Sequence, residues 1–272
     1  AARCLRVVLR RSPMDAAPSI SLVLQRLPRD AGQKGGGGSA EHEWANGDKW
    51  EGWATGDVFS GAGTYTWADA SRLACDFSDN VATGKGSFTS PAGLRYDGGF
   101  RRNLFHGKGK MQLAGGAVFE GSFRDGRPRG KGKMTWPRGD VYVGDFDEDH
   151  RLHGPGVYEW PSGAPARFAA AHASAPHGHR RAGKRFVGQF KEGAFAHGTY
   201  TFPQGQKYTG AYSDNRRHGD GRIVGAVGQV YEGQFDRGAP HGRGAFTSSD
   251  AVSVDGDFQR GVYVDKDAPA PE

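Results

Sequence analysis

The residues best suited to chemistry in this 272-residue chain are histidines that stand in front of a glycine. A neutral imidazole can act as a general base or as a metal ligand near neutral pH. Three such histidines share one place in a repeated pattern and two more lie close to it: His106, His218 and His241, then His153 and His197. A second group lies in an Ala- and Arg-rich stretch and consists of His172, His177 and His179.

The repeated pattern has a period of 23 residues, as the copies that open at Tyr96 and Phe119 show. With the opening aromatic as position 0, small residues recur at +2, +11 and +13, an aromatic at +4, a large apolar residue at +15 and a glycine at +20. Positions 0, +2 and +4 share one face of a strand. Each copy therefore predicts a β-hairpin with turns around 103–107 and at Gly116. We expect the +2 glycine to lie among rings of the adjoining hairpin, where a larger side chain has no room.

Units of this kind follow one another along most of the chain. They open at Trp50, Leu73, Tyr96, Phe119, Tyr142, Phe186, Tyr208, Tyr231 and Val254. The intervals are 23 residues, except for 22 before Tyr208 and 44 before Phe186. In the long interval we predict a degenerate, shortened hairpin at about residues 164–185, and a loop inserted between two units is the alternative.

Three consecutive copies read YDGGFRRNLFHGKGKMQLAGGAV, FEGSFRDGRPRGKGKMTWPRGDV and YVGDFDEDHRLHGPGVYEWPSG. They resemble the MORN repeat, which runs roughly YxGxWxxGxxHGxGxxxxxxG. The resemblance implies an all-β fold in which tandem β-hairpins form an elongated, single-layer antiparallel sheet, a rod-like solenoid. It also implies a scaffold, because such arrays usually serve in that role, and some members are proposed to touch membrane lipid.

Composition divides the chain into three parts. Residues 1–43 are a basic segment with a Gly-rich linker, which we expect to cap the array or to be disordered. Residues 44–264 are the repeat array, and residues 265–272 are a disordered tail. The 45 glycines and the shortage of Leu, Ile and Val suit a solenoid, whose units bury one face on their neighbours, better than a deep core. No apolar run approaches the ~20 residues of a membrane-spanning helix.

The spacing of the repeated histidines argues against catalysis. Equivalent positions on successive hairpins lie ~10 Å apart, whereas every ligand of a zinc ion lies about 2 Å from the metal. We expect each repeated histidine to order its own turn, and only the group at 172–179 could take a metal opportunistically. The chain has no GxSxG, HExxH or P-loop motif, and its acidic residues are scattered on the face opposite the aromatics. The interpretation is a protein that is not an enzyme, with no cofactor, metal site or small-molecule substrate.

The two cysteines, Cys4 and Cys75, predict no disulfide framework. Cys75 stands at a +2 position, where the pattern requires a small residue. We therefore expect a packed, reduced thiol there.

The net charge of +6 is unevenly distributed. Residues 1–34 and residues 164–185 each carry +5, so the remainder carries −4 and the repeat body is mildly acidic. This distribution argues against the whole array as a nucleic-acid or lipid platform. The contacts we expect with an anionic surface lie in the irregular segment and at position +12: Arg180, Arg181, Lys184, Arg185, Lys85, Lys108 and Lys131.

The sequence favours a non-catalytic scaffold that binds other proteins in the cytoplasm, with a cytoskeletal or ciliary setting expected by family analogy. Copies are expected to associate end to end by pairing of edge strands. The alternatives are a targeting module for anionic lipid or phosphoinositide and a regulatory region of an enzyme. The aromatics expected to pack the hairpins and to meet protein partners are Trp50, Tyr96, Phe100, Phe119, Phe123, Trp136, Tyr142, Phe146, Trp160, Phe186, Phe190, Tyr208, Tyr212, Tyr231 and Phe235.

Overall fold

The computed structural model describes residues 38–56, 58–161 and 183–265. Within these ranges every regular element is a β-strand. The chain divides into two compact units: unit 1 comprises residues 1–137 and 146–151, and unit 2 comprises residues 138–145 and 152–272. The predicted all-β class of tandem antiparallel hairpins is confirmed.

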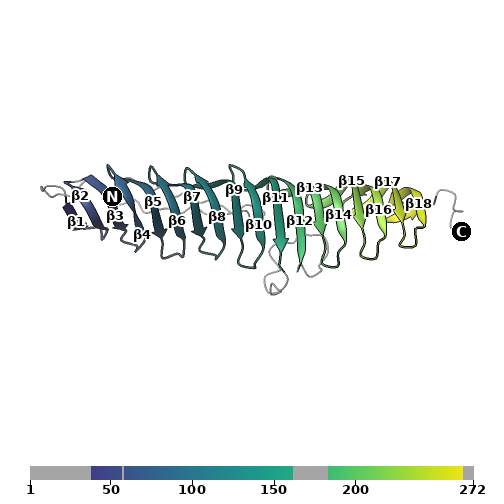
Figure 1. Ribbon diagram of the computed structural model, residues 1–272, viewed down its shortest axis with the longest axis horizontal. Helices are drawn as coiled ribbons and strands as arrows, with labels where there is room; N and C mark the ends of the chain where they lie inside the picture. The colour runs from purple at the N-terminus through teal and green to yellow at the C-terminus, as the bar shows by residue number, and fades with distance from the viewer. Residues whose placement is uncertain (1–37, 57, 162–182, 266–272) are drawn as a thin grey trace. The chain divides into compact units, whose positions relative to one another are not determined.

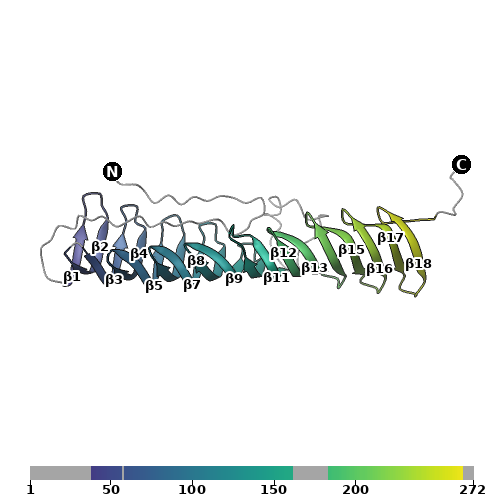
Figure 2. The same cartoon turned by 90° about the horizontal axis from the view of Figure 1, so that it is seen from above.

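The strands of each unit pair antiparallel with their neighbours along the chain, and Figures 1 and 2 show them side by side in chain order. Unit 1 holds β1 (Gly38–Glu43), β2 (Lys49–Thr55), β3 (Val58–Thr66), β4 (Arg72–Ser78), β5 (Val81–Thr89), β6 (Arg95–Arg101), β7 (Leu104–Gln112), β8 (Val118–Arg124) and β9 (Arg127–Thr135). Unit 2 holds most of β10 (Val141–Phe146), followed by β11 (Leu152–Trp160), β12 (Lys184–Lys191), β13 (Ala194–Thr201), β14 (Lys207–Ser213), β15 (Arg216–Val224), β16 (Val230–Asp236), β17 (Ala239–Thr247), β18 (Ser253–Gln259) and β19 (Val262–Val264).

The turn inside a hairpin is shorter than predicted. Arg102 and Asn103 join β6 to β7 in a two-residue turn, and both have positive φ (50° and 62°), as turns that match the twist of paired strands require. The Asn103 side chain also accepts a hydrogen bond of 2.6 Å from the backbone N–H of Ala82, in the preceding hairpin. The turn therefore anchors its hairpin to the neighbouring one.

The repeated His-Gly pair lies in a strand, so the prediction of a turn over 103–107 is wrong in its second half. His106 and Gly107 belong to β7. Gly107 has a φ of 70°, and the pairing of β6 with β7 shifts register between Gly98 and Gly99, which is a β-bulge. Glycine adopts this φ without strain, so the glycine, and not the imidazole, is the structural requirement.

The inner face of each unit is an aromatic core. Twelve of the predicted aromatics are buried there, at positions 0 and +4. The sequence pattern missed a third contributor, position +9, whose ring stacks on the opening ring of its own hairpin. The stacked pairs have centroid distances of 4.1 Å for Trp50 with Phe59, 3.8 Å for Tyr96 with Phe105 and 4.2 Å for Phe186 with Phe195.

A row of glycines crosses the strands beneath these rings. Gly98 pairs with Gly109, Gly109 with Gly121, and Gly121 with Gly132. A Cβ on Gly98 would lie 2.5 Å from the Tyr96 hydroxyl and 2.6 Å from the Cα of Gly109. The opening ring of the same hairpin and the facing backbone therefore leave no room for a larger side chain at this position. The expectation that rings of the adjoining hairpin exclude it is wrong.

From β2 to β9 this row departs from glycine at one place. Leu73 opens that hairpin in place of a ring, and Cys75 stands in the row, paired with Gly63 on one side and Gly86 on the other. The thiol is buried, and burial raises the pKa of Cys75 to about 12, so it stays protonated at neutral pH. The predicted packed thiol is confirmed for Cys75, and Cys4 lies outside the described residues.

Buried carboxylates satisfy two tyrosine hydroxyls at the edge of the core. Asp48 accepts a hydrogen bond of 2.6 Å from the Tyr65 hydroxyl and one of 2.8 Å from the backbone N–H of Ala68. In unit 2, Asp140 accepts one of 3.3 Å from Tyr158. In both of these hairpins the acid precedes the opening aromatic by two residues and supplies the partner that the tyrosine hydroxyl needs.

The boundaries differ in part from those expected. β1 pairs along its length with β2, so the sheet begins within residues 1–43, where the sequence predicts a cap or disorder. The backbone pairing of this strand overrides the low strand propensity of its glycine and serine residues. β11 pairs directly with β12, Gly156 opposite Gly188. The hairpin predicted at 164–185 lies almost wholly outside the described residues, as does the tail from 266 onward, and both stay predictions.

One buried histidine makes the stability of unit 1 depend on pH. His150 Nδ1 lies 3.1 Å from the carbonyl oxygen of Pro128, to which it donates. Burial lowers the pKa of His150, and Arg127 acts in the same direction, whereas the Pro128 hydrogen bond, Asp147 and Asp149 oppose them. The folded protein therefore favours the neutral ring.

We expect the melting temperature of the full chain to fall as the pH is lowered from about 7 to about 5.5. The pKa of His150 in the folded protein lies below the ordinary value of about 6.5. The contribution of this residue to the free energy of unfolding is therefore complete above pH ~6.5 and is lost as the pH falls through the folded pKa. His150→Asn should flatten the slope, because asparagine tolerates the φ of 62° but does not titrate. Thermal scans across this pH range provide the measurement, and an equal slope in the variant would contradict the assignment.

Candidate binding surface on the outer face of the sheet

The aromatics expected to meet partners lie mainly in the core. Trp136, Trp160 and Tyr212 are partly buried, and the other twelve are buried. The surface free to meet a partner is the opposite face of the sheet, called here the outer face, which carries the side chains at +1, +3, +12 and +14. Whether the inner aromatics take part in binding stays a prediction.

One row of the outer face alternates in charge across β6–β9. Asp97 lies opposite Lys110, Lys110 opposite Glu120, and Glu120 opposite Lys133. Lys110 Nζ lies 2.9 Å from Glu120 Oε1, and this hydrogen bond lowers the pKa of Glu120. Because these exposed charges compensate one another, this row offers little attraction to an added anion.

A second row carries charge of one sign and is called here the lysine row: Lys85, Lys108 and Lys131, at position +12 of successive hairpins. Lys85 lies opposite Gly99 and Lys108 opposite Ser122, so the intervening side chains are small and neutral. All three lysines are exposed. Lys108 Nζ donates to Ser122 Oγ at 3.0 Å, but in the described ranges no carboxylate lies within 4.0 Å of any of the three. The row therefore leaves its charge uncompensated.

The lysine row lies in a part of unit 1 where positive charge is concentrated. Residues 95–135 carry ten Lys/Arg and three Asp/Glu, a net +7, whereas residues 38–94 carry three and eight, a net −5. The mildly acidic body inferred from the sequence is thus an average over segments of opposite sign. A count by hairpin would have found this signal, but apportioning the charge to the tail and the irregular segment concealed it.

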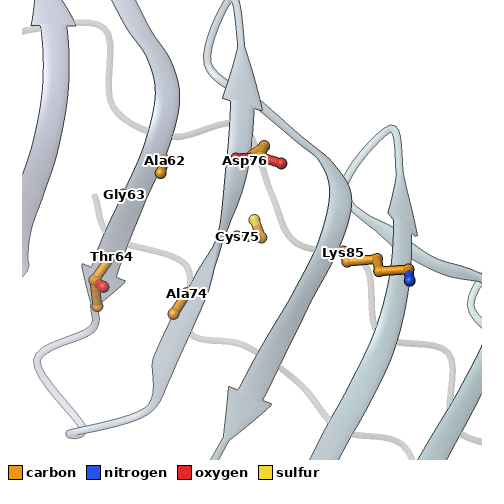
Figure 3. Close-up of a pocket in the computed structure, with 7 residues that line it drawn as sticks. All are labelled: Ala62, Gly63, Thr64, Ala74, Cys75, Asp76 and Lys85. Atoms are coloured by element: carbon orange, nitrogen blue, oxygen red, sulfur yellow. The ribbon is translucent and has the colours of Figure 1, made fainter.

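Toward β2 the lysine row leads to a shallow hollow and an exposed tryptophan. Trp53, on the outer face of β2, is 51% exposed. An open hollow of about 420 Å³ lies over β3–β5, and Figure 3 shows Ala62, Ala74, Asp76 and Lys85 among the residues around it. Trp53 stands at position +3, where the other units have small or polar residues, and that contrast was the signal that sequence reasoning missed.

The outer face of unit 2 includes an uncharged row, called here the valine–threonine row. Val157 lies opposite Val187, Val187 opposite Thr199, and Thr199 opposite Thr209. The two threonine hydroxyls are 2.9 Å apart. Val187 is 38% exposed, and Val143, also on the outer face of this unit, is 50% exposed. Apolar side chains at this exposure are available to a partner.

The basic residues predicted around 180–185 divide into two sets. Arg185 Nε lies 3.0 Å from Glu159 Oε1 on the neighbouring strand, so its charge is compensated, and Lys184 begins β12. Arg180 and Arg181 lie outside the described residues, as does the histidine group at 172–179. In the described ranges no three His, Cys, Asp or Glu side chains gather as metal ligands would, and no helix there has the length and apolarity to cross a membrane.

Comparison with known proteins identifies the repeat. The family model of the MORN repeat matches more than half of the chain, at residues 53–72, 76–95, 96–118, 119–141, 142–164, 186–207, 208–230 and 231–250. No curated protein matches the chain. A solved structure that resembles it is the TCP domain of SAS-4 (dCPAP) from Drosophila melanogaster, in complex with a proline-rich motif of Ana2 (dSTIL), at 11% identity and a TM-score of 0.35, covering 67% of this chain and 97% of that one. MORN repeats are a non-catalytic repeat type that generally mediates contact with proteins or membranes. With eight such repeats on paired hairpins, the chain belongs to the MORN-repeat family.

Proposed function

We propose that this protein is a non-catalytic scaffold that binds other proteins through the outer face of its repeats. The observation that carries the proposal is the contrast between the two faces. The inner aromatics are buried on one another, while the outer face keeps Trp53, Val143 and Val187 exposed. Apolar groups displayed on an open, regular face suit a protein surface, whereas a small substrate needs a concave site that encloses it.

Family membership supports the setting that we propose, a cytoplasmic assembly of the cytoskeleton or cilium. Self-association belongs to the same proposal. β1 and β19 are the first and last strands among the residues that the structure describes, and a second copy could extend either by strand pairing. Light scattering on the purified chain and imaging of a tagged chain in ciliated cells test these two points.

Val187→Lys is expected to reduce partner capture at least fivefold. The substitution puts a charged side chain where the valine–threonine row would be desolvated by a partner. Gln189→Lys is the matched control, because this residue is exposed on the same strand and the variant adds the same charge. The measurement is quantitative mass spectrometry of proteins retained by the immobilised full chain and by each variant.

The control variant should retain the proteins that wild type captures. Circular dichroism and thermal unfolding establish that both variants remain folded. Equal losses in the two variants, or a wild-type chain that retains no protein above background, would contradict the proposal.

A further inference from the structure

We propose that the outer face of unit 1 binds an extended acidic segment of a partner polypeptide, laid across the strands from Lys131 to Trp53. The inference rests on the proposed scaffold function and adds the chemistry of one partner. Its site is the lysine row together with the hollow and the tryptophan at the β2 end.

The spacing of the lysine row matches that of an extended chain. Each lysine lies two strands from the next, about 10 Å at ~4.8 Å per strand, and three residues of an extended segment cover the same ~10 Å. Each lysine follows the bulge glycine of its hairpin, and the φ of that glycine is 70° in all three. The three lysine side chains therefore extend from equivalent backbone positions. Carboxylates at every third residue of the partner would each meet one of these lysines.

The charges on the outer face favour an acidic occupant of this row alone. Between the lysines lie Gly99 and Ser122, which carry no charge, and Asp76 lies beyond Lys85 at the hollow. The adjacent row contains Asp97 and Glu120 among its lysines. An acidic chain is therefore attracted to the lysine row and repelled by the acidic members of the row beside it, which fixes its path.

The surface between Lys85 on β5 and Trp53 on β2 defines the rest of the ligand. Lys85 and Trp53 are three strands apart, about 14 Å, which four steps of extended chain cover. Between them Ala62 and Ala74 leave room for a backbone, while Asp76 excludes an acidic side chain. The expected segment has an apolar residue to contact Trp53, three neutral residues, and then acidic residues at every third position.

The same charges disfavour a membrane as the occupant. A flat anionic surface would meet the whole outer face, including Asp76, Asp97 and Glu120, and also the part of the unit, residues 38–94, that carries −5. A single extended chain is narrow enough to contact the lysine row without meeting Asp97 and Glu120, and it passes Asp76 with neutral residues. The observations therefore favour a polypeptide over a lipid surface.

The test uses the full chain and fluorescein-labelled peptides of eleven residues. One peptide has leucine first and glutamate at the fifth, eighth and eleventh places, with glycine and serine elsewhere, and a second has the reverse order. We expect one of the two to bind, and to bind more weakly as salt is raised from about 50 to about 500 mM. Fluorescence anisotropy gives the dissociation constants.

Two triple variants that lose the same charge distinguish a specific contribution of the lysine row to binding from a contribution of the total positive charge. Replacement of Lys85, Lys108 and Lys131 by Gln should weaken binding at least tenfold. Replacement of Lys110, Arg124 and Lys133 by Gln should change it by less than about threefold, and Trp53→Ser should weaken it severalfold. Equal effects of the two triple variants would overturn the proposal.

The remaining outcomes distinguish the other occupants. A peptide with its three glutamates adjacent that binds as tightly would overturn the proposed register. Binding of vesicles that contain anionic phospholipid, without binding of either peptide, would overturn the proposal of a polypeptide ligand and favour a membrane surface instead. If Val187→Lys abolishes partner capture while no peptide binds, the scaffold function stands and this inference fails. If neither measurement shows binding, both fail.

Discussion

Gly121→Ala is expected to lower the free energy of unfolding by about 3 kcal/mol or more, and Gly121→Val by more still. A Cβ at this place would lie 2.7 Å from the Cα of Gly132, 2.7 Å from Cζ of Phe119 and 2.9 Å from the carbonyl oxygen of Lys131. Two of these atoms are backbone of the facing strand and the third belongs to a buried ring, so none can move without disturbing the pairing of β8 with β9. Overpacking of a closed site typically costs ~1–3 kcal/mol, and here three neighbours are too close at once.

Urea unfolding followed by tryptophan fluorescence provides the measurement, and other glycines of unit 1 provide the controls. Gly115 has an unstrained backbone and no atom within 4 Å of its added Cβ, so Gly115→Ala should change stability by less than about 0.5 kcal/mol. Gly107→Ala should cost about 1–2 kcal/mol, because the site is open but φ is 70°. Gly126→Ala should also be strained, since its φ is 82°, although this glycine is buried. Equal losses at Gly121 and Gly115 would contradict the packing that we assign to the glycine row.

Raising the pH from about 10 to about 12 is expected to unfold the protein steeply. Tyr208 is fully buried, its hydroxyl donates to the carbonyl oxygen of Ala211 at 2.9 Å, and burial raises its pKa to about 12. The pKa of Tyr208 in the folded protein lies above the ordinary value of about 10. The contribution of this phenol to the free energy of unfolding is therefore complete below pH ~10 and is lost as the pH rises through the folded pKa. This one phenol should contribute roughly 2 kcal/mol to the loss over this pH range.

Five other phenols have pKa values raised by burial in the same direction, so their losses accumulate. They are Tyr65, Tyr96, Tyr142, Tyr212 and Tyr231. The measurement combines urea unfolding at several alkaline pH values with phenolate absorbance at about 295 nm, and the two should change together. Tyr208→Phe should reduce the slope by about one residue's share. A phenolate signal that appears while the chain is still folded would contradict the burial that we assign to these hydroxyls.

The sequence by itself determined the repeat, the strand-only class and most of the core. The alternation of an aromatic, a glycine and an aromatic at 0, +2 and +4 can bury only one face of a strand, and the period of 23 residues repeats that face along the chain. Burial of Tyr96 and Phe100, and of their equivalents, follows from this pattern alone. The thiol of Cys75 was predictable for the same reason, since a +2 position admits only a small side chain.

Only the tertiary structure decided what each repeated residue is for. The turn and bulge of β6–β7 depend on backbone angles, and a pattern of residue types around His106 does not distinguish a turn from a bulge. The ring at position +9 was missed because the residue type there varies between hairpins. The position holds Phe105 and Phe195 in two hairpins but Pro128 in another, so no single residue type marks it.

The binding surface also required the pairing register. Lys108 and Lys110 are two residues apart and carry the same charge, but β8 places neutral Ser122 opposite the first and acidic Glu120 opposite the second. Residues from different strands become neighbours only through cross-strand pairing, and this pairing determines which charges are compensated and which are free to attract a partner.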